Sequence, residues 1–115
     1  MSERKQFAVR VIRLCDSLPD KPSARVIANQ LLRAGTAVGA NYRAACRARS
    51  NAEFCAKMGI VEEEADETAY WMELLIEAAL VRQELLTRLL QEADEIVAMV
   101  VASITTARRK KERPK

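Results

Sequence analysis

The chain has 115 residues, which is enough for one domain that buries a core without disulfides or a metal. Half of the residues are apolar, 30% are charged and the net charge is +3, but there is no histidine, the usual general base near neutral pH and the commonest transition-metal ligand. The longest apolar run, 96–104, is far shorter than the roughly 20 residues that span a bilayer. We therefore expect a soluble protein without cofactors and without a membrane partner.

The cysteines are odd in number and form no CxxC pair: Cys15, Cys46 and Cys55. The first residues are charged and lead into no signal-peptide core. Reduced thiols in a cytoplasmic protein are the natural interpretation, with the cysteines acting as small core residues.

The first predicted helix covers residues 3–18. Phe7, Val11, Leu14 and Leu18 form one apolar stripe at helical spacing. Prolines at 19 and 22 then interrupt the pattern, because the residue before a proline avoids the α conformation.

The second predicted helix covers residues 23–47 and carries two adjacent apolar stripes, an unusually wide apolar face. Gly35 and Gly39 lie in it, and each costs a helix about 1 kcal/mol relative to alanine. Close approach of another backbone would offset that cost; the alternative is that the glycines are incidental.

The third predicted helix begins with a capping box, Ser50 followed by Glu53. The next connection, at 81–87, has neither glycine nor proline, and Thr87 is the best cap by residue type, although the fourth helix could begin at Glu84. The apolar seam from Leu89 to Ile104 suits a left-handed bundle. We predict an all-α, antiparallel up-down-up-down four-helix bundle over 1–107, with 108–115 as a basic, disordered tail.

A polar cluster is predicted between the second and third helices. In an antiparallel hairpin that turns near Arg49, Arg33 comes within reach of Glu64 and Glu67, and we expect it to pair with one of them in a partly buried position. Trp71 is expected to pack beside the core with its ring nitrogen bonded to an oxygen. The predicted structural cluster is Gln30, Arg33, Asn41, Glu64, Glu67 and Trp71, with Thr68 nearby.

Three other interpretations of these residues are weaker. Carboxylates on a bundle helix can hold di-iron, but such sites need Glu-x-x-His motifs, and the chain has no histidine. Two of these carboxylates could also perform acid–base catalysis. No nucleophile–base arrangement or glycine-rich phosphate loop accompanies them, so we do not expect an enzyme. Tyr70 and Trp71 could stack on nucleobases, although packing is the commoner role for a tryptophan beside a core stripe.

Four motifs resemble one known family. Gln30-Leu-x-Arg-Ala-Gly-Thr, Gly39-Ala-Asn-Tyr, Ala52-Glu-Phe and Glu64-Ala-Asp-Glu-Thr-x-x-Trp are similar to motifs of the four-helix-bundle proteins encoded in intervening sequences of bacterial large-subunit ribosomal RNA genes. There are three departures: Thr36 stands in place of serine, Arg43-Ala-Ala replaces a small residue followed by glutamate, and Met72 replaces leucine. The resemblance implies an antiparallel bundle that assembles as a ring-like homopentamer. More distantly, the chain is similar to the basic accessory proteins of diversity-generating retroelements, which bind nucleic acid.

The charge distribution motivates a functional hypothesis. Residues 20–49 carry about +5, residues 50–81 about −7 and residues 108–115 about +5. We expect a non-enzymatic oligomer that binds RNA or DNA with little sequence preference. The alternative is a scaffold that binds a protein partner. The candidate contacts are Arg43, Arg47, Arg49, Arg108, Arg109, Lys110, Lys111 and Arg113.

Overall fold

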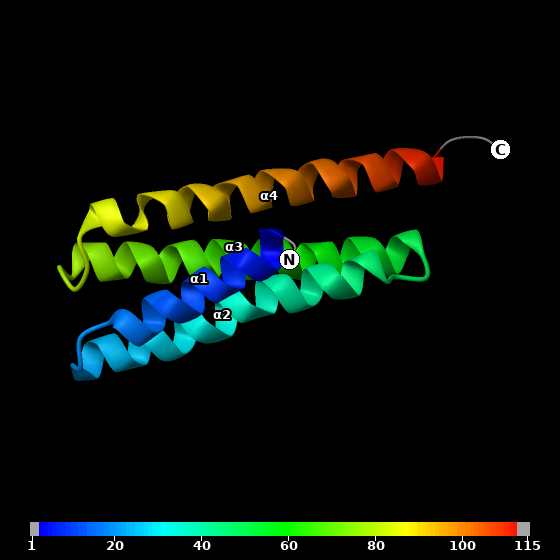
Figure 1. The fold of residues 1–115 in the computed structure, drawn as a ribbon. Helices are drawn as coiled ribbons and strands as arrows, with labels where there is room; N and C mark the ends of the chain where they lie inside the picture. Colours follow the sequence, from blue (N-terminus) through cyan, green and yellow to red (C-terminus); the bar gives the residue numbers. More distant parts are fainter. Residues whose placement is uncertain (1–2, 113–115) are drawn as a thin grey trace.

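The computed structural model describes residues 3–112 and the side chains of 4–110, and all of its regular structure is helical. The helices are α1 (Glu3–Ser17), α2 (Pro22–Cys46), α3 (Asn51–Glu77) and α4 (Gln83–Glu112). Figure 1 shows that the α1–α2 and α3–α4 connections lie at one end of an elongated molecule, and that the α2–α3 connection lies at the other end, beside the end of α4. α3 packs against both α2 and α4, whereas α1 packs on α2 and meets α4 only slightly.

The core is a column of apolar side chains that all four helices contribute. Phe7, Leu31, Met72 and Leu86 are each almost completely inaccessible to solvent. Thr68 is the buried polar residue among those described, and its hydroxyl donates to the carbonyl oxygen of Glu64 at 2.7 Å. No helix within residues 3–112 combines the length and the apolar character that crossing a membrane requires.

The close approach that would offset the cost of the helical glycines is present between α1 and α2. A Cβ atom at Gly35 would lie 2.6 Å from Cγ1 of Val11, and one at Gly39 would lie 3.4 Å from the carbonyl oxygen of Arg4. Gly35 therefore lets α1 lie against α2, and the incidental-glycine alternative is wrong for this position; at Gly39 a Cβ would make an ordinary van der Waals contact.

The third connection differs from the prediction, because α4 begins at Gln83 and not between Glu84 and Thr87. The hydroxyl of Thr87 donates to the carbonyl oxygen of Gln83 at 3.0 Å, so it bonds within its own helix and does not cap it. The chain ends α3 with Ala79 in the left-handed conformation, φ 58°. The Ala79 and Leu80 amides donate to the carbonyl oxygens of Ile76 and Leu75, the pattern of a Schellman cap without glycine.

The basic segment also differs from the expectation of a disordered tail. α4 continues through Glu112, so residues 108–112 are helical, while 113–115 lie outside the described residues. Arginine and lysine are good helix formers, and their charges interact favourably with the negative end of the helix dipole. Nothing in 108–112 interrupts a helix.

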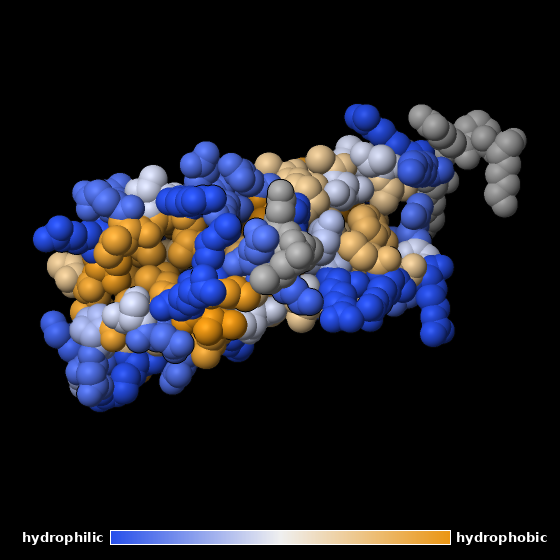
Figure 2. Space-filling view, in the orientation of Figure 1, coloured by the Kyte–Doolittle hydropathy of each residue, from blue (hydrophilic) through white to orange (hydrophobic). Residues whose placement is uncertain are grey.

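Apolar side chains are visible on one face of the molecule. Figure 2 shows them gathered between α1 and the first half of α4, toward the end of the molecule that carries the α1–α2 and α3–α4 connections. The limited contact between α1 and α4 accounts for this exposure.

Candidate nucleic-acid interface

Arg33 pairs with both acidic residues that the hairpin spacing brings near it. Its Nη1 lies 3.1 Å from Oε2 of Glu64, and its Nη2 bonds Glu67. The Arg33 side chain is 50% exposed, whereas those of Glu64 and Glu67 are 20% and 39% exposed, so the pair is partly buried on its acidic side and the guanidinium lies nearer the surface.

The remaining predicted members of the polar cluster do not join Arg33. Asn41 donates from Nδ2 to the carbonyl oxygen of Ala37 at 2.9 Å, within its own helix, and Gln30 is exposed. Nε1 of Trp71 is buried and has no hydrogen-bond partner among the described residues, so the expected bond to an oxygen is absent. The indole packs edge-on against Tyr70 instead, with ring centroids 5.0 Å apart.

The candidate cations come from two segments far apart in sequence. Arg43 and Arg47 are exposed at the end of α2, and Arg49 follows in the connection to α3. A second group, at the end of α4, is also exposed and consists of Arg108, Arg109 and Lys110. The side chain of Lys111 and the whole of Arg113 lie outside the described residues.

One hydrogen bond joins these two segments. Nδ2 of Asn51, the first residue of α3, donates to the carbonyl oxygen of Ala107 at 3.1 Å. The connection that carries Arg49 therefore lies against the last turns of α4, at the end of the molecule seen in Figure 1. We call the six described cations Arg43, Arg47, Arg49, Arg108, Arg109 and Lys110 the basic end.

The connection itself is held by the predicted cap. Oγ of Ser50 accepts from the amide of Glu53 at 3.1 Å, and Oε2 of Glu53 accepts from the amide of Arg49 at 3.1 Å. The carboxylate of Glu53 is thus engaged with backbone, and none of the six cations forms an ion pair with a described side chain. The basic end keeps its positive charge.

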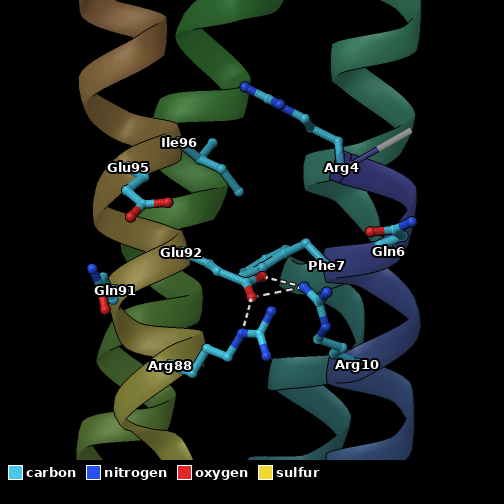
Figure 3. Close-up of a pocket in the computed structure, with 9 residues that line it drawn as sticks. All are labelled: Arg4, Gln6, Phe7, Arg10, Arg88, Gln91, Glu92, Glu95 and Ile96. Atoms are coloured by element: carbon cyan, nitrogen blue, oxygen red, sulfur yellow. Dashed lines mark hydrogen bonds and ion pairs between the residues drawn. The ribbon is translucent and has the colours of Figure 1, made fainter. Parts of the chain in front are cut away.

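A cleft of about 440 Å³ lies between α1 and α4 (Figure 3). Nη1 of Arg10 lies 2.7 and 2.6 Å from the two carboxylate oxygens of Glu92, and Nε of Arg88 approaches the same carboxylate at 3.4 Å. Phe7 and Ile96 supply apolar walls. Sequence reasoning missed the link between Arg10 and Glu92, which are 82 positions apart; only the i,i+4 spacing of Arg88 and Glu92 was a local signal.

None of the cysteines is bonded to another, and one thiol is clearly perturbed. Partial burial, helped by the negative charge of Asp16, raises the pKa of Cys15 to about 11. Its Sγ donates to the carbonyl oxygen of Ala28 at 3.5 Å. A thiol that stays protonated at neutral pH is a poor nucleophile.

Comparison with known proteins agrees with this fold. Residues 1–102 match the family model of the 23S rRNA-intervening sequence proteins. The chain belongs to this family. A similar solved structure is a protein of unknown function from the S23 ribosomal protein family of Bacteroides thetaiotaomicron, with 37% identity and a TM-score of 0.82. The similarity covers 88% of this chain and 94% of that one, and comparison with curated proteins gave no match. Membership confirms the resemblance that the motifs indicated, and neither description names an enzymatic activity.

Proposed function

We propose that this protein is a non-enzymatic, cytoplasmic oligomer that binds nucleic acid through the basic end with little sequence preference. The observation that carries the proposal is the meeting of two basic segments at one end of the molecule, joined by the Asn51–Ala107 hydrogen bond. Six exposed cations there have no acidic partner among the described side chains. Free thiols are consistent with the cytoplasm.

The chemistry of these side chains favours phosphate as the ligand. Guanidinium groups bind phosphate oxygens with paired hydrogen bonds, and neutralised phosphates release counterions, which makes such binding strong at low salt and weak at high salt. Phosphate contacts position a protein on the strand but carry no sequence information. Binding should therefore tolerate many sequences.

We further propose that the antiparallel bundle assembles as a ring-like homopentamer, as the family resemblance implies. The outer faces support repeated head-to-tail contact, because α2 is mainly basic and α3 mainly acidic on their exposed sides. Large apolar side chains also remain exposed: Val26 at 61% and Leu85 at 71%. A ring would repeat the basic end around one axis and so increase the total positive charge that the assembly presents to a phosphate backbone.

A protein scaffold is the second candidate, and the apolar side chains gathered between α1 and the first half of α4 (Figure 2) favour it. Purification from the native host with and without nuclease separates the two functions. A protein partner that survives nuclease treatment, together with absent binding to RNA and DNA, would support the scaffold.

The decisive experiment measures anisotropy of labelled RNA and DNA at low and moderate salt. The test variant changes Arg108, Arg109 and Lys110 to serine. Its matched control changes Arg13, Arg25 and Arg82 to serine, which removes the same charge from exposed positions near the α1–α2 and α3–α4 connections. We expect the test variant to bind at least about tenfold more weakly and the control to change by about twofold or less. Absence of binding by the unaltered protein, or equal losses in both variants, would contradict the function.

A further inference from the structure

A second hollow, which we call the α1–α2 trough, runs beside the basic end. It has a volume of about 500 Å³. Its cationic and polar walls are Lys5, Thr36, Tyr42, Arg43 and Arg47, and no acidic residue is among the described side chains that line it. Two members of the basic end, Arg43 and Arg47, therefore also belong to the trough, so the two surfaces are continuous.

The floor of the trough is smooth because the residues there are small. Ala8, Gly39 and Ala40 line it. A Cβ at Gly39 would lie 3.4 Å from the carbonyl oxygen of Arg4, an ordinary van der Waals contact, so glycine mainly keeps this side of the trough low. A polymer can thus lie along the floor while its charged groups meet the walls.

Tyr42 supplies an aromatic wall. The guanidinium carbon of Arg4 lies 4.9 Å from the centroid of its ring, a cation–π contact that holds the ring in place. The ring also lines the trough. Aromatic side chains beside cationic grooves are the usual means of binding single-stranded nucleic acid, because every base has a face that can stack.

We propose that the α1–α2 trough binds a single-stranded segment of nucleic acid, with phosphates on Lys5, Arg43 and Arg47 and a base against Tyr42. The inference rests on the proposed function and specifies its ligand. Bases in a duplex are stacked inside the helix and cannot reach Tyr42, whereas the phosphates of either form can reach the basic end. The trough should therefore add affinity for single strands only.

The test uses the full-length protein with oligouridylate, oligodeoxythymidylate and a duplex, each of about 12 nucleotides or base pairs. Tyr42→Leu removes the stacking surface, and Tyr70→Leu is its matched control on the outer face of α3, where Tyr70 is 52% exposed. Ala40→Glu places a negative charge in the trough, and Ala98→Glu is its control at an exposed position of α4. Circular dichroism checks that all four variants remain helical.

We expect Tyr42→Leu and Ala40→Glu to weaken binding of single strands by about tenfold and binding of the duplex by about twofold or less, with both controls unchanged. Equal weakening of single strands and duplex by Tyr42→Leu would overturn the trough. Unchanged single-strand binding in both trough variants would also overturn the trough. If the variant with serine at Arg108, Arg109 and Lys110 still loses affinity in that case, the proposed function holds without the trough. Trough variants that dissociate the oligomer but keep single-strand affinity would assign the surface to a second copy of the chain. If the unaltered protein binds none of the three ligands, the proposed function itself fails.

Discussion

Arg10 and Glu92 form an ion pair across the cleft between α1 and α4, in which Nη1 of Arg10 lies 2.7 and 2.6 Å from the two carboxylate oxygens of Glu92 (Figure 3). The pair is only partly exposed, at 34% and 20% of the two side chains. α1 and α4 otherwise meet only slightly, so this ion pair is one of the contacts that join them.

Arg10→Ala should therefore lower the free energy of unfolding by about 1–2 kcal/mol, as expected for a charge-assisted hydrogen bond at a half-buried site. Arg88→Ala is the control, since Arg88 is 81% exposed and lies farther from the same carboxylate; it should cost about 0.5 kcal/mol or less. Urea denaturation of the single variants and of the Arg10→Ala, Glu92→Ala double variant measures the coupling. A coupling energy near zero would show that the pair does not help to join α1 and α4.

Arg33→Ala should lower the free energy of unfolding by only about 0.5–1 kcal/mol, because half of the Arg33 side chain is exposed. Arg25→Ala, which breaks a more exposed pair with Asp20, should cost about 0.5 kcal/mol or less. Thermal denaturation of both variants compares them directly. A loss of several kcal/mol for Arg33→Ala would mean that assembly buries this arginine.

Gly35→Ala and Gly59→Ala should change stability in opposite directions. The new methyl at 35 would lie 2.6 Å from the buried Val11, and overpacking costs about 1–3 kcal/mol, more than the gain in helix propensity. At Gly59 nothing lies within 4 Å, so alanine should stabilise by up to about 1 kcal/mol. Chemical denaturation measures both. Stabilisation by Gly35→Ala would contradict the close packing of α1 on α2.

Ala79→Gly should stabilise the protein by about 0.5–1 kcal/mol. Ala79 has φ 58°, a left-handed conformation that costs an L-residue about 1–2 kcal/mol and glycine almost nothing. Ala78→Gly is the control, because Ala78 has φ −82° and gains nothing from glycine. The melting temperature should rise for the first variant and fall for the second; a fall in both would refute the strained cap.

Cys15 should react with thiol reagents more slowly than the exposed Cys46 at mildly alkaline pH, because burial raises the pKa of Cys15 to about 11. The folded-state pKa lies above the ordinary value of 9.0, so the stabilisation from the neutral thiol is present below pH 9 and is lost as pH rises through about 11. Mass spectrometry of peptides after timed alkylation distinguishes the thiols. The Cys15→Ser variant confirms which modified peptide contains Cys15. Equal alkylation rates for Cys15 and Cys46 would contradict the burial of the Cys15 thiol.

Local signals in the sequence were sufficient for most of the fold. Helical spacing of apolar residues and the Ser50 cap placed the first two helices and the start of the third within a residue or two of their observed bounds. Register along the α2–α3 hairpin also brought Arg33 to Glu64 and Glu67, since residues equally far from a tight turn lie side by side. Where the local signal was weak, at the connection made by Ala79, the predicted start of α4 was late.

The sequence by itself determined which side chains carry charge, which faces are apolar and to which family the chain belongs, because these depend on residue type and spacing. Only the tertiary structure decided which distant segments meet. Arg10 reaches Glu92, and Asn51 brings the two parts of the basic end together, through contacts between positions 56 or more residues apart. It likewise decided that Trp71 keeps its ring nitrogen unbonded, since burial of a donor depends on neighbours from other helices and not on the motif that contains it.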